Sequence, residues 1–205
     1  MGLGTSATTV LRTSFFTNVT ATAGTGVFTG YLKPGSAFDP CGDLADLQPQ
    51  MFDQFAAMYQ RYKVNSYTLR ITIHGSRAAG GTYNYVAASY PAIDPTALAT
   101  YQAAASQQYA KTVSGGFQLT GDASVYGLGN PPQKMYFKFQ HAAIVGSRPD
   151  AYDNGALVTA DPTAQQYAVQ PIFLQGNGAG SHGLMLEIDL WQNVTFSQKK
   201  NTVDA

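Results

Sequence analysis

Charged side chains are scarce in this chain of 205 residues, where they make up 12% of the sequence. That is about half the share usual in globular proteins. Twelve Lys and Arg balance twelve Asp and Glu, so the formal net charge is zero. This balance argues against a strongly basic nucleic-acid-binding domain and against an acidic, solvating tail. It favours association with other chains, because low net charge promotes association.

Cysteine is nearly absent as well. The single thiol, Cys41, excludes an intrachain disulfide and a zinc site built from several cysteines. No apolar run approaches the roughly 18 residues of a membrane span. Residues 1–11 lack the basic and apolar segments of a signal peptide. We therefore expect no membrane partner.

Aromatic residues, by contrast, are plentiful, with 13 Tyr and 11 Phe. A chain with this many aromatic side chains can bury a core, so global disorder is excluded. All-β domains often reach about 200 residues as one unit. The length therefore predicts a single domain over residues 1–205.

Apolar and polar residues alternate along several segments, with the period of a half-buried strand. The clearest are residues 64–74 and 184–196, where Leu69 and Ile188 belong to the apolar faces. Residues 135–139 give a third clear case. Less regular alternation, bounded by turn residues, predicts further strands at 9–21, 26–32, 82–89, 109–114 and 167–175.

Two segments carry helix signals instead. In residues 50–62, apolar side chains beginning with Phe52 recur at the spacing of one helix face. In residues 94–107, Asp94 can cap a helix and Pro95 suits its first position. Eight strands with two short inserted helices predict an all-β fold, most simply a single eight-stranded jelly-roll sandwich.

Signatures of a metal site are weak. His74, His141 and His182 lie far apart in the sequence, which predicts no metal centre. Asp150 and Asp153 could offer oxygen atoms to Ca²⁺. Turn chemistry, in which short polar side chains bond their own backbone, explains the same two residues.

Signatures of catalysis are equally weak. Glu187 and Asp189 stand two apart on one strand face, and paired carboxylates can hydrolyse glycosides. The same spacing is typical of the polar face of a half-buried strand. We therefore expect no catalytic residue, no cofactor and no metal, and we expect that the protein is not an enzyme.

Basic residues are scattered, but some could meet in the fold. Arg12, Arg70 and Lys138 could converge beside aromatic rings, which would combine charge with stacking. Lys199 and Lys200 form one of the densest basic pairs. These five side chains are the predicted nucleic-acid contacts.

One segment resembles a known family. In residues 52–64, the predicted helix leads into a strand through Tyr59, Tyr62 and Val64, a Tyr-x-x-Tyr-x-Val pattern. This resembles the capsid proteins of small circular single-stranded DNA viruses, the circovirus-like group. The order of strands and turns over residues 133–200 is similar to the last strands of the same capsids.

The resemblance implies a jelly-roll shell protein located in the virion. It implies a homo-oligomer of about sixty copies in a T=1 shell, with viral single-stranded DNA as a partner. One feature departs from the family, whose capsids usually begin with an arginine-rich arm. Here Arg12 is the only basic residue among the first 32, so the predicted shell domain lacks a basic arm.

A second reading is a lectin-like, carbohydrate-binding jelly roll. Tyr83, Tyr85 and Tyr90 lie close together in the sequence and could supply aromatic rings for stacking on a sugar. Tyr83 and Tyr85 share a strand face, whereas Tyr90 does not.

Overall fold

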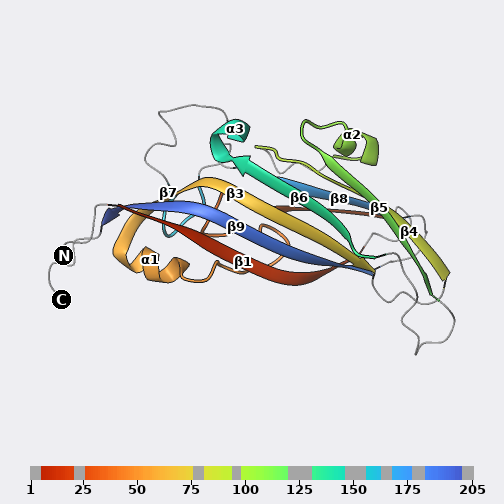
Figure 1. Cartoon of the computed structure of the whole chain (residues 1–205), viewed down its shortest axis with the longest axis horizontal. Helices are drawn as coiled ribbons and strands as arrows, with labels where there is room; N and C mark the ends of the chain where they lie inside the picture. Colours follow the sequence, from red (N-terminus) through yellow and green to blue (C-terminus); the bar gives the residue numbers. More distant parts are fainter. Residues whose placement is uncertain are drawn as a thin grey trace.

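Two antiparallel β-sheets pack face to face and form a sandwich (Figure 1). This computed structural model describes residues 6–20, 26–75, 81–93, 98–119, 131–145, 156–162, 168–176 and 183–199.

We call the five-stranded sheet sheet A and the four-stranded sheet sheet B. The strand order in sheet A is β1 (Ser6–Thr20), β9 (Gly183–Lys199), β3 (Tyr59–Gly75) and β6 (Gln133–Gln140), with the short β7 (Ala156–Leu157) paired to β3. The order in sheet B is β2 (Val27–Leu32), β8 (Gln170–Gly176), β4 (Gly81–Ser89) and β5 (Lys111–Leu119). Each sheet combines strands from both halves of the chain, as in a jelly roll. The predicted all-β jelly-roll sandwich is confirmed.

Helix α1 spans Phe52–Met58 and is shorter than the predicted helix over residues 50–62. Its C-cap, Tyr59, already has an extended backbone and begins β3. The helical spacing continues to Tyr59 because its ring contacts Phe196, which also contacts the ring of Phe55 in the helix. The apolar spacing therefore arises from side chains that pack in one cluster, and not from one continuous helix.

Helix α2 spans Tyr101–Ala105, so the prediction of a helix over residues 94–107 was too long. Its N-cap is Thr100, whose Oγ1 accepts a hydrogen bond from the Ala103 N–H at 3.2 Å. The start predicted at Asp94 lies outside the described residues.

The sequence did not predict helix α3 (His141–Val145) or strand β7. These elements have five and two residues, respectively. Segments this short contain too few residues to establish a helical or a strand period.

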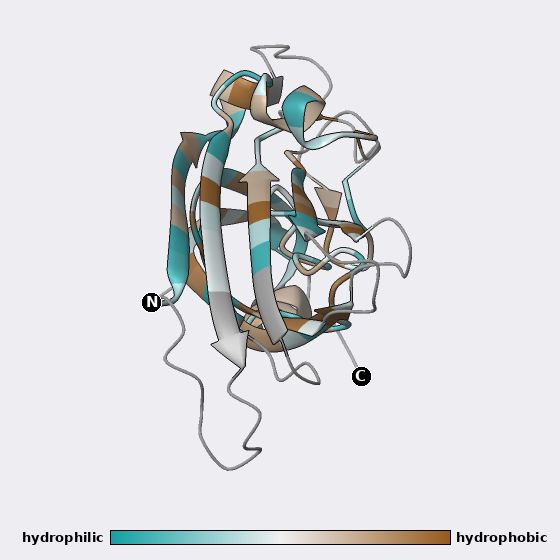
Figure 2. Ribbon diagram, turned by 90° about the vertical axis from the view of Figure 1, so that its right-hand side faces the viewer, coloured by the Kyte–Doolittle hydropathy of each residue, from teal (hydrophilic) through white to brown (hydrophobic). Residues whose placement is uncertain are grey.

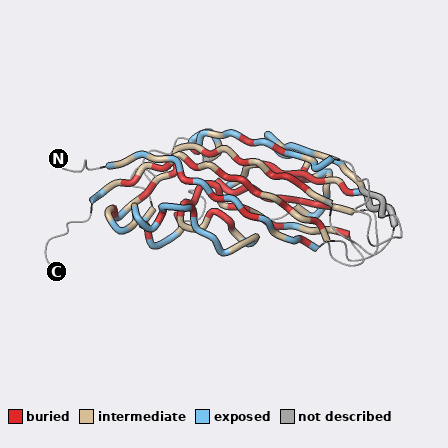
Figure 3. The backbone as a smooth tube through the Cα atoms, turned by 60° about the horizontal axis from the view of Figure 1, so that its bottom comes forward, coloured by how far each residue is buried: buried red, intermediate tan, exposed pale blue. Residues whose placement is uncertain are grey.

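The apolar faces of the two sheets meet in the main core (Figure 3). Leu69 and Ile188, which pack here, are both 0% exposed. Bands of polar and apolar residues follow one another along the strands, as the predicted alternation requires (Figure 2).

A second cluster of buried side chains joins α1 to one end of sheet A. Phe52 packs edge-on against Tyr62 with ring centroids 5.6 Å apart. Phe55 stacks on Phe196 at 4.8 Å. Tyr62, from the family-like segment, therefore fixes α1 against the sheet.

A buried hydrogen-bond chain links the two sheets. The Tyr67 hydroxyl of β3 donates to Oε1 of Gln170 in β8 at 3.2 Å. Nε2 of Gln170 donates to Oγ of Ser89 in β4 at 2.8 Å. Burial raises the pKa of Tyr67, so its hydroxyl stays protonated and able to donate.

A partly buried ionic cluster fixes the segment that follows β2. Lys33 Nζ donates to Asp39 at 2.6 Å and to Asp161 at 2.8 Å. Ser36 Oγ donates to the other oxygen of Asp161 at 2.6 Å. Burial alone would lower the pKa of Lys33, but its hydrogen bonds to the two carboxylates outweigh burial and raise that pKa. The ammonium therefore holds two distant loops together.

We expect Leu69→Ala and Ile188→Ala each to lower the free energy of unfolding by about 2–5 kcal/mol, because each leaves a cavity in the core. Urea unfolding at neutral pH measures the change. Val10→Ala is the matched control: Val10 is 60% exposed, and its truncation should change stability by less than about 0.5 kcal/mol. Losses as small as the control's would contradict the inward placement of Leu69 and Ile188.

Candidate functional site

Sheet A turns one face away from sheet B, and we call this its outer face. Register places the following side chains on it: Arg12, Ser14 and Phe16 of β1; Glu187, Asp189 and Trp191 of β9; Arg61, Lys63, Thr68, Arg70, Thr72 and His74 of β3; and Lys134, Tyr136 and Lys138 of β6. These residues alternate with the buried residues of the core, as the strand period requires, except at a register shift between Val64 and Ser66 of β3.

The outer face is strongly basic although the chain is neutral. Among the described residues, six of nine Lys and Arg lie on it, against two of seven Asp and Glu. Six positive charges against two negative ones leave an excess of four. The formal balance of the sequence therefore hides a separation of charge in space.

The carboxylate of Asp189 organises the centre of this face. Its side chain is 1% exposed, although it points away from the core. Ser14 Oγ donates to it at 2.8 Å and Arg12 Nη2 at 3.2 Å, and Arg70 contacts its second oxygen through Nε at 2.9 Å. Strands β1 and β3 thus hold one anion of β9 between them.

These contacts set the charge state of Asp189. Burial by itself would raise the pKa of Asp189, but the hydrogen bonds from Ser14, Arg70 and Arg12 outweigh it and hold that pKa below its usual value. The hydrogen bond with Asp189 likewise raises the pKa of Arg70. Both groups are therefore ionised at neutral pH.

Glu187 extends the cluster toward the end of the sheet. Arg70 Nη2 lies 3.0 Å from one of its oxygens and His74 Nε2 lies 2.9 Å from the other. Both carboxylates of the face are thus engaged by side chains of β3. Glu187 and Asp189 therefore do not form a free acid/base pair.

Arg12 lies over an aromatic ring. Its Cζ is 5.5 Å from the centre of the Trp191 ring, within the range of a cation–π contact. Its side chain remains 59% exposed. Phe16 and Tyr136, on either side of the face, are 63% and 51% exposed. Aromatic and basic side chains are therefore interleaved on one surface.

The structure brings together three of the five predicted nucleic-acid contacts. Arg12, Arg70 and Lys138 share the outer face, as predicted. The guanidinium of Arg70, however, is engaged by two carboxylates. Lys199 is exposed at the far end of β9, eight residues beyond Trp191, and Lys200 lies outside the described residues.

Sequence reasoning expected aromatic rings beside Arg12, Arg70 and Lys138 but did not name Trp191 or Lys134 among the contacts of this face. Trp191 and Lys134 occupy the same strand parity as Asp189 and Lys138, so the period of two could have found them. The pairing of Arg70 with Asp189 depends on the register between β3 and β9. The strand period alone does not determine that register.

The aromatic run considered for sugar binding does not form an exposed surface. Tyr85 and Tyr90 are each 5% exposed and pack in the core. Gly115 lies opposite Tyr85, and a Cβ there would stand 2.6 Å from the tyrosine oxygen. The side chain of Tyr83 is outside the described residues. The sugar-binding hypothesis required exposed aromatic side chains, and the two described tyrosines are buried.

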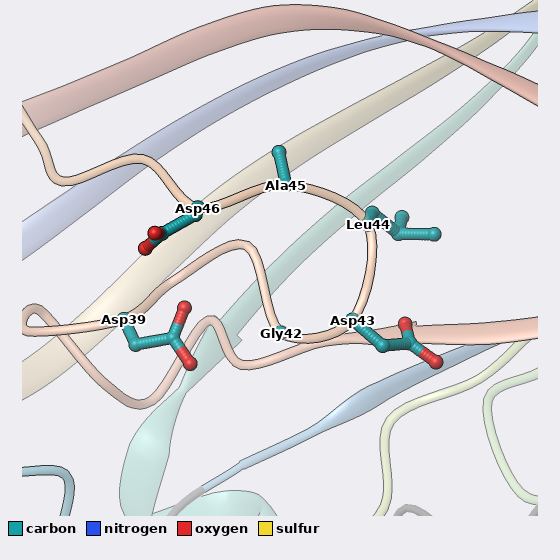
Figure 4. Close-up of a pocket in the computed structure, with 6 residues that line it drawn as sticks. All are labelled: Asp39, Gly42, Asp43, Leu44, Ala45 and Asp46. Atoms are coloured by element: carbon teal, nitrogen blue, oxygen red, sulfur yellow. The ribbon is translucent and has the colours of Figure 1, made fainter.

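A hollow of about 370 Å³ lies beside the segment after β2 and is lined by Asp39, Gly42, Asp43, Leu44, Ala45 and Asp46 (Figure 4). Two of its carboxylates already have partners. Asp39 binds Lys33, and Asp43 accepts the Tyr31 N–H at 2.7 Å. Of the residues that the structure describes, no three His, Cys, Asp or Glu are grouped to hold a metal ion.

Asp150, Asp153 and His182 lie outside the described residues. Cys41 is buried, and burial raises the pKa of its thiol to about 12. No helix in the described ranges has the length and apolar character needed to cross a membrane.

No protein-family model and no curated protein matches the sequence. The chain is similar to a solved structure of a giant freshwater prawn virus, the Macrobrachium rosenbergii nodavirus, described as a semi-empty VLP. The two share 13% identity over 97% of each chain, with a TM-score of 0.52. At this identity the likeness shows the shared fold alone.

Two further structures have lower TM-scores. The mud crab tombus-like virus gives a TM-score of 0.48 at 14% identity, covering 98% of this chain and 85% of that chain. Tobacco necrosis virus gives 0.44 at 13% identity, covering 95% and 98%.

We expect Asp189→Asn to lower the free energy of unfolding by roughly 2–3 kcal/mol at neutral pH, because it weakens hydrogen bonds between charged groups. Asp53→Asn, at an exposed site on α1, is the matched control and should change stability by less than about 0.5 kcal/mol. Urea unfolding measures both.

The lowered pKa of Asp189 also predicts how the stability difference between the unmodified protein and Asp189→Asn depends on pH. The folded-state pKa of Asp189 lies below the unfolded value near 3.8, so its contribution is present above that value and is lost as pH falls through the folded pKa. We expect the stability difference between the unmodified protein and Asp189→Asn to narrow below about pH 4. A constant difference down to pH 3 would contradict the assigned role of the carboxylate.

Proposed function

We propose that this chain is the coat protein of a small icosahedral virus and that its copies assemble into a closed shell around the viral genome. The observation that carries the proposal is the sandwich of β1-β9-β3-β6 on β2-β8-β4-β5. A nodavirus chain, solved as a VLP, shares this fold over 97% of both chains. The function follows by analogy with that particle.

The surface of the isolated chain supports assembly. Several large apolar side chains remain about half exposed; they are Leu47, Met51, Tyr109 and Leu157. Exposed apolar groups of this kind commonly belong to contacts with other proteins. The outermost strands of both sheets also present backbone groups that a neighbouring copy can cover. Charged residues, which are scarce here, are depleted at the centres of protein interfaces.

Finer features of the proposal rest on the sequence resemblance to circovirus-like capsids. They are one shell domain over residues 1–205, about sixty copies in a T=1 shell, a single-stranded DNA genome and a place in the virion. Arg12, Lys138, Lys199 and Lys200 remain proposed genome contacts. Arg70 is a weaker candidate, because Asp189 and Glu187 already offset its charge.

We expect the purified chain to elute as a particle of about sixty times its own mass, where one copy is 21.8 kDa. Multi-angle light scattering measures this mass, and the ratio of absorbance at 260 and 280 nm across the peak reports captured nucleic acid. Leu69→Ala is the control, because a subunit destabilised by about 2–5 kcal/mol should give fewer particles.

A monomer at every salt concentration and pH tested would contradict the shell. A glycan array on that monomer would then test the sugar-binding reading. A particle of a different, discrete mass would retain the shell and overturn only the T=1 copy number.

A further inference from the structure

The outer face of sheet A carries more cations than carboxylates among the described residues. It carries six Lys and Arg against two carboxylates, and Arg12, Arg70 and His74 contact those two carboxylates. The other described Asp residues lie elsewhere, in the segment after β2, on α1 and after β7. Lys134 and Lys138 are exposed on this face, and a surface where described cations outnumber carboxylates is complementary to a polyanion.

This charge also argues against a second copy of the same face. In a two-fold contact the same patch lies on both subunits, so each basic face would meet another basic face. Like charges placed together cost several kcal/mol in an interface. The occupant is therefore of opposite charge.

Aromatic side chains add a second requirement. Trp191 lies in the same row across the sheet as Arg12 and Lys138, while Tyr136 and Phe16 belong to the two rows that follow. Successive strands lie about 4.8 Å apart, so the row from Arg12 to Lys138 spans roughly 15 Å. Charge and rings together favour a ligand that has both phosphates and flat bases.

Arg12 is held ready for stacking. Asp189 fixes one edge of its guanidinium at 3.2 Å, and the Trp191 ring lies beneath it at 5.5 Å. The Arg12 side chain as a whole is still 59% exposed. An unpaired base can stack on an arginine plane or on an aromatic ring, whereas a base inside a duplex cannot reach either one.

We propose that the outer face of sheet A binds single-stranded nucleic acid, with Arg12 and Trp191 as the base-stacking pair and Lys134 and Lys138 as phosphate contacts. The proposal deepens the proposed function and rests on it for the identity of the ligand as the enclosed genome. In the resembled capsids an arginine-rich arm contacts the genome, whereas the contacts proposed here lie on a folded sheet.

The test uses a fluorescein-labelled oligomer of 20 deoxythymidines, which forms no duplex. Binding is measured by anisotropy, and the emission of Trp191, the only tryptophan of the chain, reports contact at the site. We expect saturable binding, with quenching of Trp191 over the same range of oligomer concentration. An RNA oligomer of 20 uridines shows whether the outer face of sheet A distinguishes ribose from deoxyribose.

Four variants separate stacking from charge. Arg12→Ala and Trp191→Leu should each weaken binding about 5- to 150-fold, the effect of losing one stacked base. Arg12→Lys should recover little, because lysine keeps the charge but loses the plane. Lys134→Ala should reduce the slope of log affinity against log salt by about 0.7.

Lys111→Ala is the matched control, since Lys111 is an exposed lysine on β5 of sheet B. It should bind the oligomer as the unmodified chain does. Thermal unfolding of every variant confirms that it is folded before binding is compared.

Three results would overturn the proposal. The first is an affinity for a 20-base-pair duplex equal to that for the single-stranded oligomer, and the second is a loss of affinity in Lys111→Ala equal to that in the outer-face variants. The third is full competition by heparin while Trp191 emission never responds to the oligomer. The last would mean a polyanion patch without base stacking. Light scattering of the same samples keeps the two proposals apart. If particles form but the oligomer never quenches Trp191, the proposed shell stands and the proposed binding face is wrong. If the chain stays a monomer but binds the oligomer, the binding face stands and the shell is wrong.

Discussion

Strand β9 is the element on which the rest of this structure depends. All fifteen residues of β1 pair with it on one side, and β3 pairs with it on the other. Because successive side chains of a strand point to opposite faces, this one strand builds two surfaces. Ile188 and Leu190 enter the core, while Asp189 and Trp191 lie outside it. A slip of one residue would exchange the two sets, so the core and the basic face are specified by the same register.

Much of this arrangement can be read from the sequence, because the period of two is a local property. It predicts every strand of both sheets except the two-residue β7, and it places Arg12, Arg70 and Lys138 on exposed faces. It fails where contacts between distant segments decide. Tyr59 continues the helical spacing of α1 because a ring of β9 packs against it, although its backbone is extended. The offset of the Arg70 charge by a carboxylate likewise depends on which residue of β9 lies opposite Arg70. Strand pairing joins distant segments and is not a property of the local sequence.

A zero net charge is a statement about the sum of charges and says little about any one surface. In this chain the acidic residues after β2 border the hollow of Figure 4, while the outer face of sheet A collects most of the described cations. Electrostatic binding depends on the local potential within about 10 Å, the screening length near physiological salt. A chain with zero net charge can therefore present a basic surface on one face and a weakly charged surface elsewhere.

A binding surface on a sheet differs physically from a basic arm. A disordered arm loses conformational freedom when it binds, which reduces the net affinity of each contact. The outer face of sheet A is already ordered, because Asp189 holds Arg12 and Arg70 in place before any ligand arrives. Its limit is the amount of charge, because among the described residues six cations stand against two carboxylates on this face. A surface with so few charges would position a nucleic acid more than it would neutralise it.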